Sequence, residues 1–180
     1  MIETERLLLR RFTMDDLDDL AAIFAKPEVF WYPAKRGYSR EETAEMLQKR
    51  FIDRWDEQDF GLFAVIRRSD ERLLGYTGLA IPYFLPEVLP AVELGYRYDP
   101  DAWGRGYATE ASASSLDYGF DTVGLDRIIA IYHPENVRSG DVMRRLGMKV
   151  ERDTVHPTDG DPLRVYEIFR DEWRARGRRS

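Results

Sequence analysis

Hydrophobic positions in the first third of the chain follow mostly helical spacing. After a short apolar run at 7–12, which predicts a strand, apolar residues recur every three or four positions from Leu17 to Phe24. A second stripe of this kind lies between positions 44 and 55, and a serine and a glutamate at capping-box spacing precede it. The pattern therefore predicts one strand followed by two helices, with an aromatic, irregular segment at 29–33 between the helices.

The rest of the chain alternates between strand-like and helical patterns. Apolar runs at 61–66 and 73–81 are joined by a polar turn and predict a hairpin. The later elements are expected as strands at 92–98, 128–132, 149–154 and 163–169 and as helices at 106–122 and 134–146. This order predicts an α/β fold with a mixed sheet. No repeat or linker divides the chain, so residues 1–180 are expected to form a single domain.

Composition narrows the class of protein. The 180 residues are 43% hydrophobic and 33% charged, so the chain can form both a core and a well-solvated surface. A formal net charge of −6 argues against a dedicated nucleic-acid-binding protein, which would normally carry a basic face. No segment approaches the roughly 18 apolar residues of a membrane span, and the N-terminus lacks the apolar core of a signal peptide. A cytoplasmic location is therefore expected.

The absence of cysteine limits the chemistry that the chain can perform. Without cysteine there is no disulfide, no thiolate metal site and no cysteine nucleophile. The chain has two histidines, His133 and His156, which are too few for a three-histidine metal site. No metal cofactor is therefore expected.

The segment Trp-Gly-Arg-Gly-Tyr-Ala-Thr-Glu-Ala at 103–111 is the strongest candidate for a binding site. It follows a predicted strand and opens into a predicted helix, whose first N–H groups have no intrahelical acceptor. Gly104 and Gly106 would let an anion such as pyrophosphate approach the backbone, and Arg105 could add a charge. Position 109 is a threonine where a dinucleotide fingerprint needs glycine, and no Gly-Lys-Ser/Thr follows, which excludes a P-loop. A plain strand-to-helix turn is the structural alternative.

A second candidate lies at the next predicted strand-to-helix junction. Asn136 stands where it could cap the helix, and Ser139 lies in the first helical turn. Helix capping is the structural alternative for Asn136, and simple solvation is the alternative for Ser139.

Together these segments resemble the GNAT N-acetyltransferase superfamily. Residues 103–108 are similar to its acetyl-CoA loop, Q/R-x-x-G-x-G/A, with Trp103 in place of the first Gln or Arg. The form W-G-x-G-Y-A-T-E-A resembles the Rim-type branch, relatives of enzymes that acetylate the N-terminal alanine or serine of ribosomal proteins. The similarity covers nearly the whole chain, because further segments at 4–10, 92–96, 135–139, 146–148 and 166–173 also match that branch.

The resemblance implies a fold, a cosubstrate and a set of binding residues. The implied fold is a mixed, mostly antiparallel twisted sheet of about seven strands with about four helices, splayed at its central parallel strands. The implied cosubstrate is acetyl-CoA, and direct transfer to an amine in a ternary complex is expected because no cysteine can carry the acetyl group. The residues implied to bind acetyl-CoA are Tyr96, Arg97, Tyr98, Trp103, Gly104, Arg105, Gly106, Tyr107, Ala108, Thr109 and Asn136.

Two side chains are expected to perform the acid–base chemistry. Glu93 stands in an otherwise apolar strand and is the candidate general base, with a structural salt bridge as the alternative. Ser139 is implied to protonate the departing thiolate. The superfamily's usual acid is a tyrosine seven residues after the asparagine, and that position is Met143 here. His133 is the reserve base, or otherwise a hydrogen-bonded surface histidine.

The acceptor is expected to be a primary amine. A protein N-terminus is the first candidate acceptor, and a small molecule (an aminoglycoside, polyamine or amino-acid analogue) is the alternative acceptor. A non-catalytic acetyl-CoA-binding module is the alternative to an enzyme. The residues expected to line the acceptor pocket are Trp31, Tyr32, Phe84 and His133, although core packing is an equal alternative for Phe84 and for its counterpart Phe30. We expect no nucleic-acid or membrane partner, a monomer or homodimer, and a frayed basic tail at 174–179.

Overall fold

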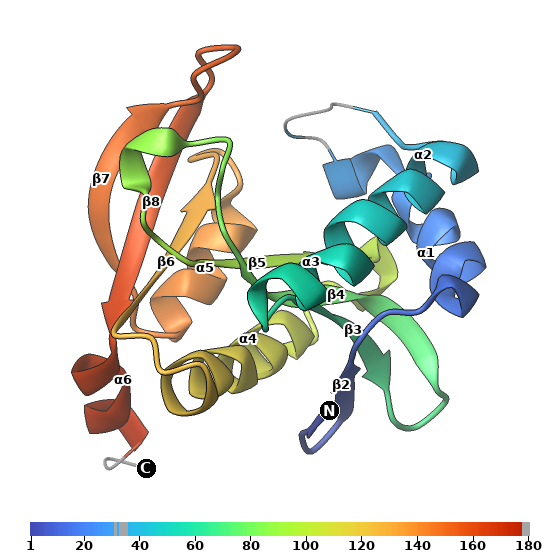
Figure 1. Cartoon of the computed structure of the whole chain (residues 1–180), viewed down its shortest axis with the longest axis horizontal. Helices are drawn as coiled ribbons and strands as arrows, with labels where there is room; N and C mark the ends of the chain where they lie inside the picture. Colours follow the sequence, from blue (N-terminus) through green and yellow to red (C-terminus); the bar gives the residue numbers. More distant parts are fainter. Residues whose placement is uncertain (31, 33–35, 178–180) are drawn as a thin grey trace. The chain divides into compact units, whose positions relative to one another are not determined.

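The computed structural model describes residues 1–30, 32 and 36–177. In chain order (Figure 1) the elements are β1 (Ile2–Glu3), β2 (Leu7–Arg10), α1 (Leu17–Phe24), α2 (Arg40–Met46), α3 (Asp53–Gln58), β3 (Leu62–Arg67), β4 (Arg72–Ala80), β5 (Glu93–Tyr98), α4 (Tyr107–Asp117), β6 (Arg127–Tyr132), α5 (Val137–Arg145), β7 (Lys149–Val155), β8 (Pro162–Phe169) and α6 (Arg170–Gly177). The strand order is β1-β2-β3-β4-β5-β6-β8-β7.

The sheet is mixed, as predicted. The pairings β1–β2, β2–β3, β3–β4, β6–β8 and β7–β8 are antiparallel, whereas β5 and β6 run parallel. In these described strands the β5–β6 ladder is a single register pair, Glu93 with Ile129.

Three elements differ from the sequence-based expectation. The strand β1 is too short for any periodicity to reveal it, and it forms by pairing with Leu8 and Leu9. The second predicted helix is continued by a π-helical segment, Leu47–Ile52, into α3. The first residues of the tail that was expected to fray, 174–177, form the last turn of α6 and are exposed; Trp173 donates to Asp117 (2.7 Å) and Arg174 pairs with Asp121 (2.9 Å).

The chain divides into two compact units that are interleaved in sequence. The first comprises residues 1–78 and 96–114, and the second comprises residues 79–95 and 115–180. Each unit therefore contains one part of β5 and one part of α4.

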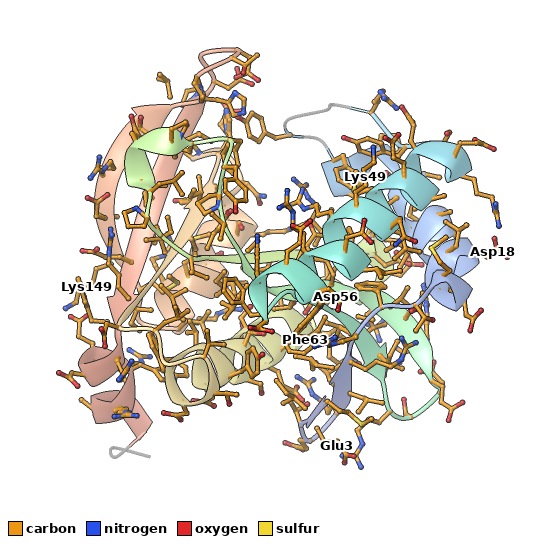
Figure 2. The ribbon with its side chains drawn as sticks, viewed as in Figure 1. Glu3, Asp18, Lys49, Asp56, Phe63 and Lys149 are labelled. Carbon is orange, nitrogen blue, oxygen red and sulfur yellow. The ribbon has the colours of Figure 1, made fainter. Side chains whose placement is uncertain are left out.

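An aromatic cluster forms the core of the first unit. Phe51 meets Phe12 and Tyr76 edge-on, each with ring centroids 4.9 Å apart, and Phe24 meets Phe30 at 4.8 Å. Phe30 is only 4% exposed, so core packing is the correct interpretation for this residue. Charged side chains of the helices, including Asp18, Lys49 and Asp56, are exposed to solvent (Figure 2).

The second unit is built around β6, whose side chains are largely buried. It pairs with β8 over six residues, from Arg127 to Tyr132, and its start lies beside β5. The chain then passes from β6 directly into α5 through a short turn. This arrangement places two sequence-predicted residues, Asn136 and Ser139, just beyond the end of the central strand.

Candidate functional site

The turn between β5 and α4 contains two glycines in the left-handed backbone region. Gly104 has φ +72° and Gly106 has φ +81°, a conformation that residues with side chains rarely adopt. A Cβ on Gly104 would have no neighbour within 4 Å, so this glycine faces open space. A Cβ on Gly106 would come within 3.3 Å of the Arg6 guanidinium. The backbone of this turn is therefore accessible to a ligand at Gly104, whereas the Arg6 side chain lies beside it at Gly106.

The first N–H groups of α4 are available to such a ligand. The Glu110 N–H donates to the Gly106 carbonyl at 3.0 Å, which begins the helical pattern. Within the described part of the chain, the N–H groups of Tyr107, Ala108 and Thr109 have no acceptor, and the buried hydroxyl of Thr109 also has no hydrogen-bond partner. N–H groups at a helix start carry partial positive charge and bind anions. This donor set fits a pyrophosphate.

Glu110, in the first turn of α4, connects this helix to the N-terminal segment. Its Oε1 accepts from the Thr4 hydroxyl at 2.6 Å, and its Oε2 accepts from Arg6 Nε at 2.7 Å. Burial alone would raise the pKa of Glu110, but the hydrogen bonds from Thr4 and Arg6 outweigh it and hold the pKa below its usual value. The carboxylate is therefore ionised at neutral pH and paired with a cation.

Trp103 joins this turn to the end of β5. Its indole Nε1 donates to the Tyr98 carbonyl at 3.0 Å, and the Tyr98 hydroxyl forms a buried hydrogen bond with Thr77. Burial raises the pKa of Tyr98, so its hydroxyl stays protonated. The tryptophan that departs from the family pattern thus has a structural partner in its own unit.

The side chain of Arg97 is directed to the segment that follows α1. Its guanidinium donates to the carbonyls of Val29 (2.7 Å) and Tyr32 (3.1 Å) and lies over the Phe30 ring. Tyr98 is likewise engaged through its hydroxyl, and Tyr96 is half-buried. The side chains of Arg97 and Tyr98 thus have partners within the protein, which is compatible with the expectation that the backbone of 96–98 faces the cosubstrate.

Asn136 and Ser139 come together at the start of α5 in the second unit. Asn136 is the N-cap residue, and its side-chain oxygen accepts the Ser139 N–H at 3.2 Å. Asn136 therefore caps α5, as the sequence indicated it could. This bond uses Oδ1 and leaves the amide nitrogen of Asn136 without a partner among the described residues. Ser139 is half-buried in the first turn of the helix.

Glu93 and His133 lie at different levels along the paired strands β5 and β6. Glu93 begins β5 opposite Ile129, and β6 continues for three residues beyond that level, which is about 10 Å of strand. His133 follows, and its Nδ1 accepts the Glu135 N–H at 3.2 Å. His133 is thus a hydrogen-bonded histidine in the turn before α5.

The residues expected to line an acceptor pocket have different surroundings. Trp31 lies outside the described residues. Tyr32 contributes its carbonyl to Arg97 in the first unit. Phe84, in the second unit, is 43% exposed and stacks on His156 with ring centroids 5.6 Å apart, so core packing is wrong for this residue.

Thr4, Arg6 and Glu110 contact one another beside this turn, and no role was predicted for them from the sequence. All three lie in segments that resemble the family, at 4–10 and 103–111. No periodicity relates residues that are 104 positions apart, as Arg6 and Glu110 are, so only their position in the motifs pointed to them.

The described ranges of the chain contain no group of three or more His, Cys, Asp or Glu side chains that could hold a metal ion. They also contain no helix that is both long enough and apolar enough to cross a membrane.

Comparison with known sequences gives a match over most of the chain. The model of the acetyltransferase (GNAT) domain family matches residues 6–149. The N-acetyltransferase YnaD of Bacillus subtilis is 31% identical over 150 residues, which cover 83% of this chain and 83% of that protein. The spermidine N(1)-acetyltransferase of Escherichia coli is 35% identical over 57 residues, which cover 32% of this chain and 31% of that protein.

Solved structures with the same fold cover nearly the whole chain. A GNAT-family acetyltransferase from Bacillus anthracis has a TM-score of 0.79 and 27% identity, covering 95% of this chain and 99% of that chain. A ribosomal-protein-S5-alanine acetyltransferase from Vibrio fischeri has a TM-score of 0.73 and 20% identity, covering 96% and 97%. These matches confirm the predicted fold class, with eight strands in place of the expected seven.

Proposed function

The chain belongs to the GNAT family of acetyl-CoA-dependent N-acetyltransferases, and we propose that it moves the acetyl group of acetyl-CoA to a primary amine by direct transfer in a ternary complex. The observation that carries the proposal is the turn at Gly104 and Gly106, whose open backbone and free N–H groups suit the pyrophosphate of the cosubstrate. Direct transfer is favoured because the chain has no cysteine to hold the acetyl group. The family model runs through both units, which supports a single domain.

Each segment is assigned a binding role from the polar groups that the hydrogen bonds described above do not use. The N–H groups of 104–109 would hold the pyrophosphate, with Arg105, which is exposed, adding charge. The backbone of 96–98 would pair with the pantetheine arm, because the side chains of Arg97 and Tyr98 already have partners. Asn136 would contribute its amide nitrogen, since its oxygen caps α5.

Glu93 and Ser139 would divide the proton transfers. Glu93 would accept the proton of the amine, through water where the amine does not reach it directly, and Ser139 would donate to the departing thiolate. Their places support separate roles, because Glu93 lies level with the middle of β6 and Ser139 lies beyond its end. Loss of either group should cost about 10²–10⁴-fold in rate, since binding and orientation would still be provided.

A protein N-terminal amine is the acceptor that we propose first. An α-amine has a pKa of about 7.7–8.0, whereas a lysine amine has a pKa near 10.4, so the α-amine needs far less help from a base. Relatives by fold include the ribosomal-protein-S5-alanine acetyltransferase of Vibrio fischeri, which is consistent with this choice.

A small cationic amine is the second candidate. The formal net charge of −6 favours cationic partners. The short match to spermidine N(1)-acetyltransferase points in the same direction.

An acceptor panel tests these proposals. The purified protein is incubated with acetyl-CoA and, separately, peptides that begin with alanine or serine, an N-terminally blocked lysine peptide, spermidine and an aminoglycoside. Free thiol and product mass are measured. Acetylation of the free peptide N-terminus alone supports the first candidate, and acetylation of spermidine alone supports the second. Binding of acetyl-CoA without any product would indicate a non-catalytic module, and failure to bind acetyl-CoA would overturn the whole proposal.

A further inference from the structure

Arg6 makes contacts along the whole turn that leads into α4. Its Nε and Nη2 lie 2.7 and 2.6 Å from Glu110 Oε2, and its Nη1 donates to the Arg105 carbonyl at 2.9 Å. The guanidinium also lies over the Tyr107 ring, 4.7 Å from its centroid, and 3.3 Å from the place of a Gly106 Cβ. One side chain from the hairpin of β1 and β2 thus contacts Arg105, Gly106, Tyr107 and Glu110.

From these contacts we propose that Arg6 is a positioning residue for the pyrophosphate of acetyl-CoA. It acts in two ways, by orienting the N–H groups of the turn and by neutralising the carboxylate of Glu110. The inference rests on the proposed role of this turn in acetyl-CoA binding.

The orienting effect follows from the geometry of the peptide bond. In a trans peptide the C=O of one residue and the N–H of the next point in opposite directions. Arg6 holds the Arg105 carbonyl toward itself, so the Gly106 N–H must point away from Arg6. The left-handed conformation at Gly104 and Gly106 makes this orientation of the peptide accessible. Without Arg6 the peptide can rotate and present its carbonyl oxygen, which would repel a phosphate.

The neutralising effect concerns the carboxylate nearest to the proposed anion site along the chain. Glu110 lies in the first turn of α4, where a carboxylate is attracted by the same N–H groups that would bind a phosphate. Arg6 and Thr4 occupy both of its oxygens: Oε1 accepts from the Thr4 hydroxyl and the Arg6 N–H, and Oε2 from the guanidinium. The carboxylate is thereby held on the hairpin and its charge is balanced. Removing Arg6 would leave an unbalanced negative charge beside an anion site.

A double-mutant cycle separates the two effects. We expect Arg6→Gln to raise the Kd for acetyl-CoA about tenfold, because it loses both the orientation and the neutralisation. Glu110→Gln alone should change the Kd by less. The double variant R6Q/E110Q should recover part of the loss, since the repelling charge has gone with its partner.

Two controls identify the pyrophosphate as the group concerned. The KM for S-acetylpantetheine, which lacks pyrophosphate, should be the same in wild type and in Arg6→Gln. Arg68→Gln is the matched variant, because Arg68 donates to the Thr4 carbonyl at 2.8 Å and so supports the same hairpin without contacting α4. This variant should bind acetyl-CoA as wild type does.

The outcomes distinguish this inference from the proposed function. If wild type binds acetyl-CoA and Arg6→Gln binds equally well, or if S-acetylpantetheine is affected to the same degree, the inference is wrong and the proposed function stands. If wild type does not bind acetyl-CoA, the proposed function itself fails. Should Arg6→Gln not fold, as judged by circular dichroism, Arg6→Lys replaces it. The lysine keeps the charge but cannot reach Glu110 and the Arg105 carbonyl together, so an intermediate Kd is expected, and a wild-type Kd would contradict the orienting effect.

Discussion

Lys26 Nζ lies 2.7 Å from Asp99 Oδ1 and thereby joins the residue two positions after α1 to the residue directly after β5. Arg72, at the start of β4, pairs with the other oxygen at 2.8 Å, and Oδ1 also accepts the Asp101 N–H at 3.0 Å. The Asp99 side chain is only 4% exposed, so both cations bind a nearly buried carboxylate. This cluster lies between the end of β5 and the glycine turn and links both to α1 and β4.

We predict that Asp99→Asn lowers the free energy of unfolding by about 2 kcal/mol at pH 7, as expected for the loss of hydrogen-bonded charge pairs. Burial alone would raise the pKa of Asp99, but Lys26, the Asp101 N–H and Arg72 together hold it below its usual value. A lowered folded-state pKa stabilises the protein above the unfolded pKa of about 3.9, and this contribution is lost as the pH falls through the folded-state pKa. Urea unfolding at pH 7 and in acid should show wild type and variant converging in acid.

Asp101→Asn is the matched control for this prediction. Asp101 lies 3.5 Å from Lys26 and 3.3 Å from Arg72, but its side chain is 65% exposed. Solvent screening limits such a pair to about 0.5 kcal/mol. If both substitutions lowered the free energy of unfolding equally, burial of Asp99 would not contribute to the strength of its ion pairs.

A second prediction compares two glycines with the same backbone conformation. Gly106 and Gly124 both have φ +81°, so Gly106→Ala and Gly124→Ala should each cost about 1 kcal/mol of stability through backbone strain. Only Gly106 lies in the proposed anion-binding turn. Calorimetry with acetyl-CoA should therefore show about tenfold weaker binding for Gly106→Ala and no change for Gly124→Ala. Unchanged binding in both would show that the glycines serve the turn alone.

A third prediction separates the two functions assigned to Asn136. Asn136→Ala removes the cap of α5 and should cost about 1 kcal/mol, whereas Asn136→Asp keeps an accepting oxygen and should preserve stability. If the amide nitrogen binds acetyl-CoA, both variants lose affinity. Thermal unfolding and acetyl-CoA titration of the two variants measure these effects, and normal affinity in Asn136→Asp would remove the cofactor role.

A fourth prediction concerns the pH dependence of the reaction. Glu93→Gln should lower kcat about a hundredfold, most strongly at low pH, where little neutral amine is present. Ser139→Ala should instead lose most activity at high pH, with acetyl-CoA affinity little changed. The pH–rate profiles of the two variants, each beside wild type, provide the measurement. Identical profiles or wild-type rates would overturn the division of roles, and loss of acetyl-CoA binding in Ser139→Ala would make that serine a binding residue.

Local features of the chain were predictable from residue type and spacing. The helix stripe from Leu17 to Phe24, the strand before the glycine turn and the cap at Asn136 all depend on neighbours within a few positions. For the same reason the glycine turn and its free N–H groups could be located before any contact was known, because positive φ angles and unpaired helix-start groups are properties of short segments. The candidate site was predictable to this extent.

Interactions between distant parts of the chain were not predictable in this way. The guanidinium of Arg97 binds the carbonyl of Val29, 68 positions earlier, and no local pattern indicated this partner. The basic tail was expected to be a solvated end, and its residues 174–177 are exposed, but Arg174 pairs with Asp121, 53 positions earlier. In both cases the partner lies in another element, and residue spacing carries no information about which elements become neighbours.

The amino-acid sequence by itself therefore determined the order of strands and helices, the family and the place of the glycine turn, because these follow from local backbone preferences and a continuous motif. Only the tertiary structure decided that Arg6 and Glu110 support this turn and that Lys26 and Asp99 hold the end of β5. These ion pairs form between residues 104 and 73 positions apart, and they exist because the folded chain brings opposite charges to one place; burial of Asp99 strengthens the second pair.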